Sequence, residues 1–126
     1  MLKLVFCLTR LPHLTREEFQ RYWRETHAPL VRRHAETLRI QRYVQLHSLP
    51  ASDPLNEALR ASRGGPEGYD GIAELWWRSA EDLAAATATE EGRAASLELL
   101  EDEKRFIDLA RSPLWLAHEN EVIRQR

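Results

Sequence analysis

The residues best suited to chemistry lie on the polar and apolar faces of a few short segments. In 16–37, one apolar stripe of a helix would carry residues spaced by four, four, three and four, namely Phe19, Trp23, His27, Leu30 and His34. Burial disfavours imidazolium, so we expect His27 to be neutral near pH 7 and able to take a proton from a carbon beside a carbonyl. The alternative is a structural histidine bonded to a carbonyl that Pro29 leaves free.

A second pair of candidates lies on the alternating segment 39–47. Tyr43 and His47 fall on its polar side. A hydroxyl and an imidazole there could orient a substrate carbonyl or stabilise the enolate formed from it. A packed tyrosine and a strand-end histidine are the structural alternatives.

The segment 69–78 offers both space and aromatic surface. Gly71 and Ala73 share one face and leave room for a planar ligand, but Trp76 and Trp77 point to opposite faces. Only one of these two tryptophans can therefore line a pocket, and the other is expected in the core or at an interface.

Acidic residues in two places are weaker candidates. Asp70 and Glu74 share a face of the segment 69–78, where they could act as an acid/base pair or form an ion network with Arg78. The run 101–103 is interpreted as a solvated helix face.

These residues must be positioned by alternating strands and helices. A capping box at Thr15–Glu18 starts the first helix, and Pro29 predicts a kink or break near 26–28. A second helical region follows Ser79 and is expected to break near 89–92. The strands are expected at 2–9, 39–47, 69–78 and 115–123, and the long connection 48–68 is expected to hold one short helix and to act as a lid.

This order predicts an α+β, ferredoxin-like βαββαβ fold, with a four-stranded antiparallel sheet whose helices lie on one side. The chain is expected to form a single domain over 1–126. The other face of the sheet needs cover, and a second copy of the chain is the simplest way to provide it, so we expect a homodimer.

Composition excludes several classes of function. The 126 residues carry 18 basic and 20 acidic side chains, a net charge of -2, which gives no field for nucleic acid or an anionic membrane. The apolar run 4–8 is too short for a signal or spanning segment, and the single Cys7 fits a reducing compartment, so a cytoplasmic protein is expected. No metal site is expected, because His27 and His34 lie about 10.5 Å apart along an intact helix.

The segment 15–31, with its Tyr22-Trp-x-x-x-His-Ala-Pro29 element, resembles the signature of the EthD domain family. The segments 42–47, 69–77 and 102–108 resemble the later blocks of that family, in the same order. The resemblance implies a dimeric α/β barrel, and it includes dehydratases and decarboxylases that act on aromatic polyketides. It assigns site roles to His27, Tyr43 and His47.

The sequence therefore favours a cofactor-independent lyase or isomerase of dehydratase, decarboxylase or cyclase type, acting on an aromatic or polyketide-like carbonyl compound. His27 would be the base, Tyr43 and His47 would hold the oxyanion, and Asp70 would orient a histidine or act as the acid. The substrate would be lined by four aromatic candidates, Phe19, Trp23, Trp76 and Trp77. Two alternatives stay open: a non-catalytic ligand-binding or accessory dimer, and a haem or oxidase-type protein with His27 or His47 as the axial ligand.

Overall fold

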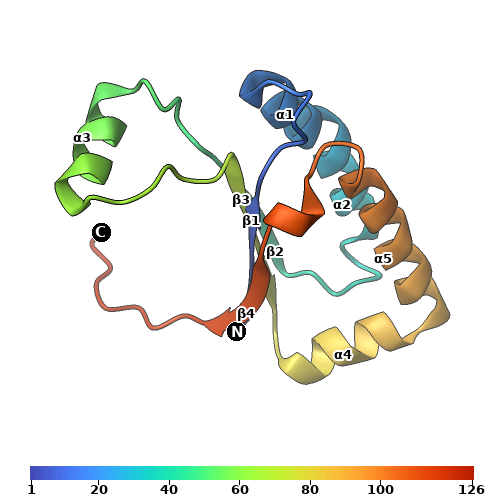
Figure 1. The fold of residues 1–126 in the computed structure, drawn as a ribbon. Helices are drawn as coiled ribbons and strands as arrows, with labels where there is room; N and C mark the ends of the chain where they lie inside the picture. The colour runs from blue at the N-terminus through green and yellow to red at the C-terminus, as the bar shows by residue number, and fades with distance from the viewer.

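A computed structural model describes all 126 residues and shows the predicted α+β, ferredoxin-like architecture. The four strands are β1 (Leu2–Leu8), β2 (Arg42–His47), β3 (Gly71–Trp77) and β4 (Leu114–His118). They form one antiparallel sheet in the order β2-β3-β1-β4. Most of the helices cover one face of this sheet, as Figure 1 shows.

The first helical region is continuous but changes its winding. α1 (Arg16–Tyr22) starts at the predicted capping box, in which Thr15 and Glu18 exchange hydrogen bonds. A π-helical segment, η1 (Trp23–His27), follows and leads into α2 (Ala28–His34). The predicted kink before Pro29 is therefore a widened turn, because Pro29 has no amide hydrogen to donate to the preceding turn. The helix also ends three residues earlier than the sequence pattern suggests.

The second helical region consists of two helices, and the break between them, at Thr89, lies within the predicted range 89–92. α4 (Ala80–Ala88) is capped by Ser79, and α5 (Glu90–Glu103) is capped by Thr89, whose hydroxyl accepts from the Gly92 amide. A short 3-10 turn, η2 (Leu109–Arg111), then leads to β4.

The connection 48–68 holds the expected short helix. α3 (Pro54–Arg63) is capped by Asp53 and ends at Gly64, whose φ of 62° is a left-handed conformation that glycine adopts without strain. None of the α3 residues is buried, and the helix lies on the opposite side of the sheet from α1, α2, α4 and α5 (Figure 1). Its action as a lid stays a prediction.

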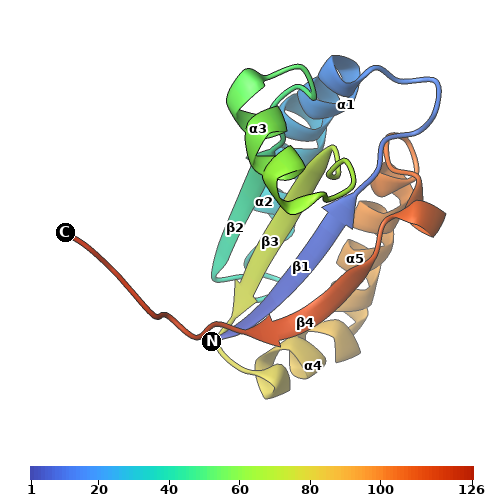
Figure 2. The same cartoon turned by 60° about the vertical axis from the view of Figure 1, so that its left-hand side comes forward.

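The last strand is shorter than predicted. β4 covers Leu114–His118, and the residues 119–126 form no regular element, although the pattern predicts a strand as far as 123. Figure 2 shows this tail running away from the sheet. No helix combines the length and apolarity needed to cross a membrane.

The sheet register decides which side chains face the helices. Phe6 lies opposite Ala73, which in turn lies opposite Gln45, so these residues share one face of the sheet. Phe6 and Ala73 belong to the core cluster. The polar side of β2, with Tyr43 and His47, therefore points into the space between sheet and helices.

Candidate active site

The first feature of the site is a buried pair between two helical elements. The Nδ1 atom of His27 lies 2.7 Å from a carboxylate oxygen of Asp102 near the end of α5. His27 and Asp102 are only 5% and 4% exposed. The second oxygen of Asp102 accepts from the Tyr22 hydroxyl at 2.6 Å and from the Arg105 guanidinium at 3.0 Å. Asp102 thus binds three donors.

The electrostatics of this pair keep the base neutral and the acid ionised. Burial lowers the pKa of His27, although the hydrogen bond to Asp102 opposes this. Burial alone would raise the pKa of Asp102, but hydrogen bonds from Tyr22, His27 and Arg105 outweigh it and hold that pKa below its usual range. A neutral His27 therefore donates its Nδ1 proton to Asp102, which leaves the lone pair on Nε2.

The Nε2 atom of His27 is not fully enclosed. It makes no hydrogen bond within the chain, since only Nδ1 is paired. Among the side-chain nitrogen and oxygen atoms, only His47 Nδ1 is both buried and without a partner. His27 Nε2 therefore keeps some contact with the surroundings, and this is the basic atom of the pair.

A second polar network joins the π-helical segment to β2. The Gln45 amide nitrogen donates to the Trp23 carbonyl and to the Tyr43 hydroxyl, both at 3.0 Å. The Trp23 indole nitrogen also donates to the Tyr43 hydroxyl, at 3.2 Å. The Gln45 side-chain oxygen lies 2.8 Å from His47 Nε2. Gln45 thus links the two sequence-predicted residues of this strand.

The directions of these bonds follow from the Trp23 carbonyl, which can only accept. The Gln45 NH2 group must face that carbonyl, so the Gln45 oxygen faces His47, whose Nε2 must carry the proton. His47 Nδ1 is then an acceptor, and it is buried without a partner. Burial lowers the pKa of His47, with the charge of Arg24 acting in the same direction. Neutral His47 has no free donor for an oxyanion.

Glu103 is the least expected member of the site. Its side chain is partly buried, it makes no hydrogen bond, and burial together with the charge of Asp102 raises its pKa to about 7. Its charge also raises the pKa of Tyr43, which burial has already raised. The expectation that 101–103 is a solvated face is therefore wrong for two of its three residues: Asp102 is buried, and Glu103 is partly so.

The space predicted beside Gly71 and Ala73 is occupied by the chain itself. A side-chain carbon added at Gly71 would lie 2.4 Å from the Trp23 indole, so only glycine allows this close approach. Phe19 and Trp23 are buried in the core and contact each other with ring centroids 5.7 Å apart. Trp23 also packs on the His47 ring, at 4.6 Å.

Trp76 and Trp77 lie on opposite faces, as predicted. Trp77 faces the helices and donates to the Leu38 carbonyl at 2.7 Å. Trp76 lies on the other face, between the cations of Lys3 and Arg42, with its indole donating to Glu119. Trp76 is therefore separated from His27 by the sheet.

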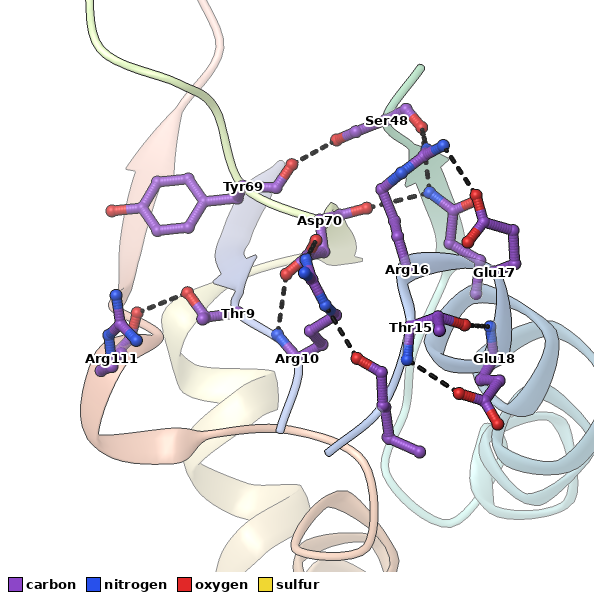
Figure 3. Close-up of polar contacts among 12 residues, drawn as sticks. Thr9, Arg10, Thr15, Arg16, Glu17, Glu18, Ser48, Tyr69, Asp70 and Arg111 are labelled. Atoms are coloured by element: carbon purple, nitrogen blue, oxygen red, sulfur yellow. Dashed lines mark hydrogen bonds and ion pairs between the residues drawn. The ribbon is translucent and has the colours of Figure 1, made fainter. Parts of the chain in front are cut away.

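Asp70 does not join the histidines. Its carboxylate accepts from the Arg10 backbone at 2.8 Å and from the Arg10 guanidinium at 2.6 Å, as Figure 3 shows. Glu74 instead pairs with Lys3 at 3.0 Å, so Asp70, Glu74 and Arg78 do not form the single ion network considered from the sequence. The ring nitrogens of His27 and His47 bond Asp102 and Gln45 instead, which leaves Asp70 as a tie between β1 and the start of β3.

Two hollows of about 380 and 320 Å³ open at the surface, and neither is lined by His27, Tyr43 or His47. The smaller one is lined by Tyr22 and Arg105, the two groups that cover Asp102. No group of three His, Cys, Asp or Glu side chains is arranged to hold a metal ion.

Sequence reasoning missed Asp102, Glu103 and Gln45. A signal existed for Asp102, because the buried residues Gly92, Ala95, Asp102 and Phe106 follow a helical stripe at spacings of three, seven and four. For Gln45 the signal was its place between Tyr43 and His47 on the same side of the strand. The partial burial and raised pKa of Glu103 depend on tertiary packing, and no pattern in the sequence indicates them.

The matching family model is that of the EthD domain, and it covers residues 11–110. The chain belongs to the EthD family. The match contains every residue of the two polar networks, and Glu103 as well. A comparison with curated proteins finds no match.

Solved structures with the same fold include other EthD proteins. An EthD family protein from Bacillus halodurans has a TM-score of 0.60 at 20% identity, covering 95% of this chain and 100% of that chain. A dimeric protein of unknown function with a ferredoxin-like fold, from Bacteroides fragilis, has a TM-score of 0.58 at 8% identity, covering 94% and 95%. A mutant of SnoaB, a cofactor-independent oxygenase from Streptomyces nogalater, has a TM-score of 0.53 at 14% identity, covering 98% and 97%.

Proposed function

We propose that this EthD protein is a cofactor-independent enzyme that removes a proton from a carbon beside a carbonyl, with His27 as the general base. The observation that carries the proposal is the bond between His27 Nδ1 and buried Asp102, which leaves Nε2 unprotonated and without a hydrogen-bond partner in the chain. A carboxylate that holds one ring nitrogen fixes the tautomer and stabilises the imidazolium formed when the other nitrogen takes a proton.

The reaction begins as the Cα–H bond of the substrate breaks. The proton passes to His27 Nε2, and the electron pair moves through the carbonyl to give an enolate and a histidinium paired with Asp102. Return of the proton from the histidinium to another carbon completes an isomerisation. In a dehydration the enolate re-forms the carbonyl as the Cα=Cβ bond forms and the Cβ–O bond breaks, and the histidinium gives its proton to the β-hydroxyl, which leaves as water. Both outcomes balance without an added redox partner. The substrate class is an aromatic or polyketide-like carbonyl compound.

Tyr43 is the group that faces the developing enolate in this proposal. Its hydroxyl oxygen accepts bonds from both Trp23 and Gln45, so its own proton is left to donate. His47 takes no part as a donor, because its protonated Nε2 is already bonded to Gln45. Its contribution is to hold Gln45 and to pack against Trp23.

Two likenesses support the proposal. The EthD family match favours a protein that binds or converts small molecules, and SnoaB shows that this fold supports cofactor-independent chemistry in a related structure. The proposal also includes a homodimer formed through the sheet face that α1, α2, α4 and α5 leave uncovered. The protein from Bacteroides fragilis with a similar fold is described as dimeric.

The proposal is tested by proton exchange, which requires no knowledge of the natural product. The α-protons of 2-tetralone, an aryl-fused ketone, are followed by proton NMR in deuterated buffer near neutral pH. The wild-type protein is expected to accelerate deuterium incorporation. His27→Ala should lose about 10²-fold or more of this acceleration, and Asp102→Asn should lose a similar part because the tautomer is no longer fixed.

The matched control is His13→Ala, which removes an exposed histidine before α1 and should exchange as the wild type does. Full exchange activity in His27→Ala would contradict the base assignment. Binding of 2-tetralone without any acceleration of exchange would instead favour a non-catalytic ligand-binding protein.

A further inference from the structure

The connection between β2 and β3 carries a helix that its own chain does not cover. α3 (Pro54–Arg63) has no buried residue. Leu55 and Leu59, one turn apart on the same side of the helix, are 69% and 57% exposed. Glu57 and Arg60 pair with each other on the other side. α3 is thus an amphipathic helix whose apolar side has no partner within the chain.

A helix of this length needs such a partner. Both ends of α3 are well formed, since the Asp53 carboxylate accepts from the Asn56 backbone amide and Gly64 takes the left-handed conformation that closes the helix. However, every hydrogen bond of residues 50–65 joins two residues of that same segment. Isolated helices shorter than about 12–15 residues are marginal in water, and α3 has 10 residues. Contact on its apolar side is therefore the missing source of stability.

The base of the connection is held by the rest of the chain. The Ser48 carbonyl, at its start, accepts from the side chains of Arg16 and Gln20 on α1. The Ser48 hydroxyl donates to the Tyr69 carbonyl, at its end, at 2.6 Å (Figure 3). From this base α3 extends to the side of the sheet away from α1, α2, α4 and α5 (Figure 1). On that side lies the open sheet face, the one for which the proposed homodimer supplies the cover.

An exposed apolar side chain lies between the open sheet face and the arm. Leu46, two residues before Ser48, is 44% exposed and lies opposite Ile72. Both residues share the open face with Trp115, which is 48% exposed. A partner that covers Leu46 therefore also reaches the base of the connection that carries α3.

We propose that α3 is a dimerisation arm, whose residues Leu55 and Leu59 pack against a second copy of this chain. The inference rests on the homodimer of the proposed function and goes beyond it by assigning α3 to the interface. A second copy is the occupant that the arrangement favours, because a chain that covers the open sheet face lies on the same side of the sheet as α3. The twofold symmetry of a homodimer makes this contact twice, once with each arm.

The dissociation constant of the dimer tests the arm. It is measured by fluorescence-detected sedimentation, from nanomolar concentration upward, for the wild type and for Leu55→Ala/Leu59→Ala, since alanine keeps the helix propensity of α3. The double variant should have a dissociation constant about 10²-fold or more higher, because the apolar surface of both arms is lost from the interface. Glu57→Ala, on the polar side of α3, is the matched control and should dissociate as the wild type does.

Trypsin cleavage reports the docking of α3 directly. Arg60 and Arg63 lie in α3, and a docked helix opens less often than an isolated one. At a fixed trypsin concentration, cleavage of the wild type after these arginines should slow about tenfold or more as the chain passes from monomer to dimer. Mass spectrometry of the fragments measures the rate. In Leu55→Ala/Leu59→Ala, cleavage should be fast at every protein concentration.

The arm is ruled out if the double variant dissociates as the wild type does, or if trypsin cuts wild-type α3 equally fast in monomer and dimer. A wild type that stays monomeric at every concentration overturns the arm together with the homodimer. Failure of the base assignment is a separate result, read from proton exchange in His27→Ala. An arm that binds a second copy in a protein without exchange activity would stand by itself.

Discussion

Asp102 and Glu103 are neighbours in sequence whose pKa values are shifted in opposite directions. Asp102 binds three donors, and these hold its pKa down despite burial. Glu103 has no donor, so burial and the Asp102 charge raise its pKa to about 7. The contrast depends on which side of the last turn of α5 meets Tyr22 and His27. Two acids pushed apart in this way are typical of sites that transfer protons.

The pKa of Glu103 has a consequence for stability. It lies above the value of about 4.3 for an unfolded chain, so the folded protein binds this proton more tightly. The stabilising contribution is complete below about pH 4.3 and is lost as pH rises through about 7. We therefore expect Glu103→Gln to be more stable than the wild type at pH 8 by about 1–3 kcal/mol, measured by urea unfolding, with the difference much reduced at pH 4.5.

Glu101→Gln, at an exposed position of the same helix, is the control and should show no such difference. His27 has the opposite effect on the free energy of unfolding. Its pKa is lowered in the folded state, so its stabilising contribution is lost as pH falls below about 6.5. This loss is common to wild type and variant, so it cancels in the comparison. A Glu103→Gln protein no more stable than the wild type at pH 8 would show that Glu103 ionises freely.

At the scale of elements, the sequence predicted most of the scaffold. Local signals were sufficient for the caps at Thr15, Asp53 and Ser79, because each is a side chain bonded to a nearby amide. The alternation of 39–47 correctly placed Tyr43 and His47 on one side. Pro29 predicts only that the first helix is interrupted near 26–28. Residue spacing does not show whether the helix kinks, breaks or widens into a π-helical turn before the proline.

η1 approaches β3 closely at Gly71. Gly71 lets the Trp23 indole reach the sheet, and Trp23 in turn supplies the carbonyl and the N–H that orient Gln45 and Tyr43. We expect Gly71→Ala to lower the free energy of unfolding by about 1–3 kcal/mol, because the added carbon would overlap the indole. Urea unfolding followed by tryptophan fluorescence measures the loss of unfolding free energy, and the fluorescence of the folded protein reports the displaced indole.

Gly68→Ala is the matched control, since a carbon added there meets nothing within 4 Å. It should unfold as the wild type does. Equal free energies of unfolding for both variants would mean that the Trp23 indole moves aside without a loss of stability. The close approach at Gly71 would then not be needed to position Trp23.

For the whole molecule, the two faces of the sheet differ in what covers them. The helices cover the face with Phe6 and Trp77, while Val5 and Trp115 lie on the other face. Trp115 is 48% exposed there. The order of strands and helices in the sequence was sufficient to predict the fold class. What covers the second face depends on another chain, and the pattern of a single chain does not specify the geometry of that interface.

We expect light scattering after size exclusion to give twice the 14.7 kDa chain mass at micromolar concentration. Trp115→Glu should shift the protein towards the monomer, because it places a charge in the proposed interface. Leu116→Glu changes the next residue, which is 49% exposed and faces the helix side, so it should leave the mass unchanged. A monomeric wild type, or equal effects of both variants, would contradict the interface.

His27 and Asp102 are separated by 75 positions along the chain, and no shorter stretch contains both. During synthesis the histidine leaves the ribosome long before the acid that orients it, so a nascent chain holds the imidazole without its fixed tautomer. Fragments that stop before α5 would hold the proposed base without its acid, even if β1 to β3 had paired. In the proposed function, competence for proton removal therefore arises only once α5 has docked and brought Asp102 to His27.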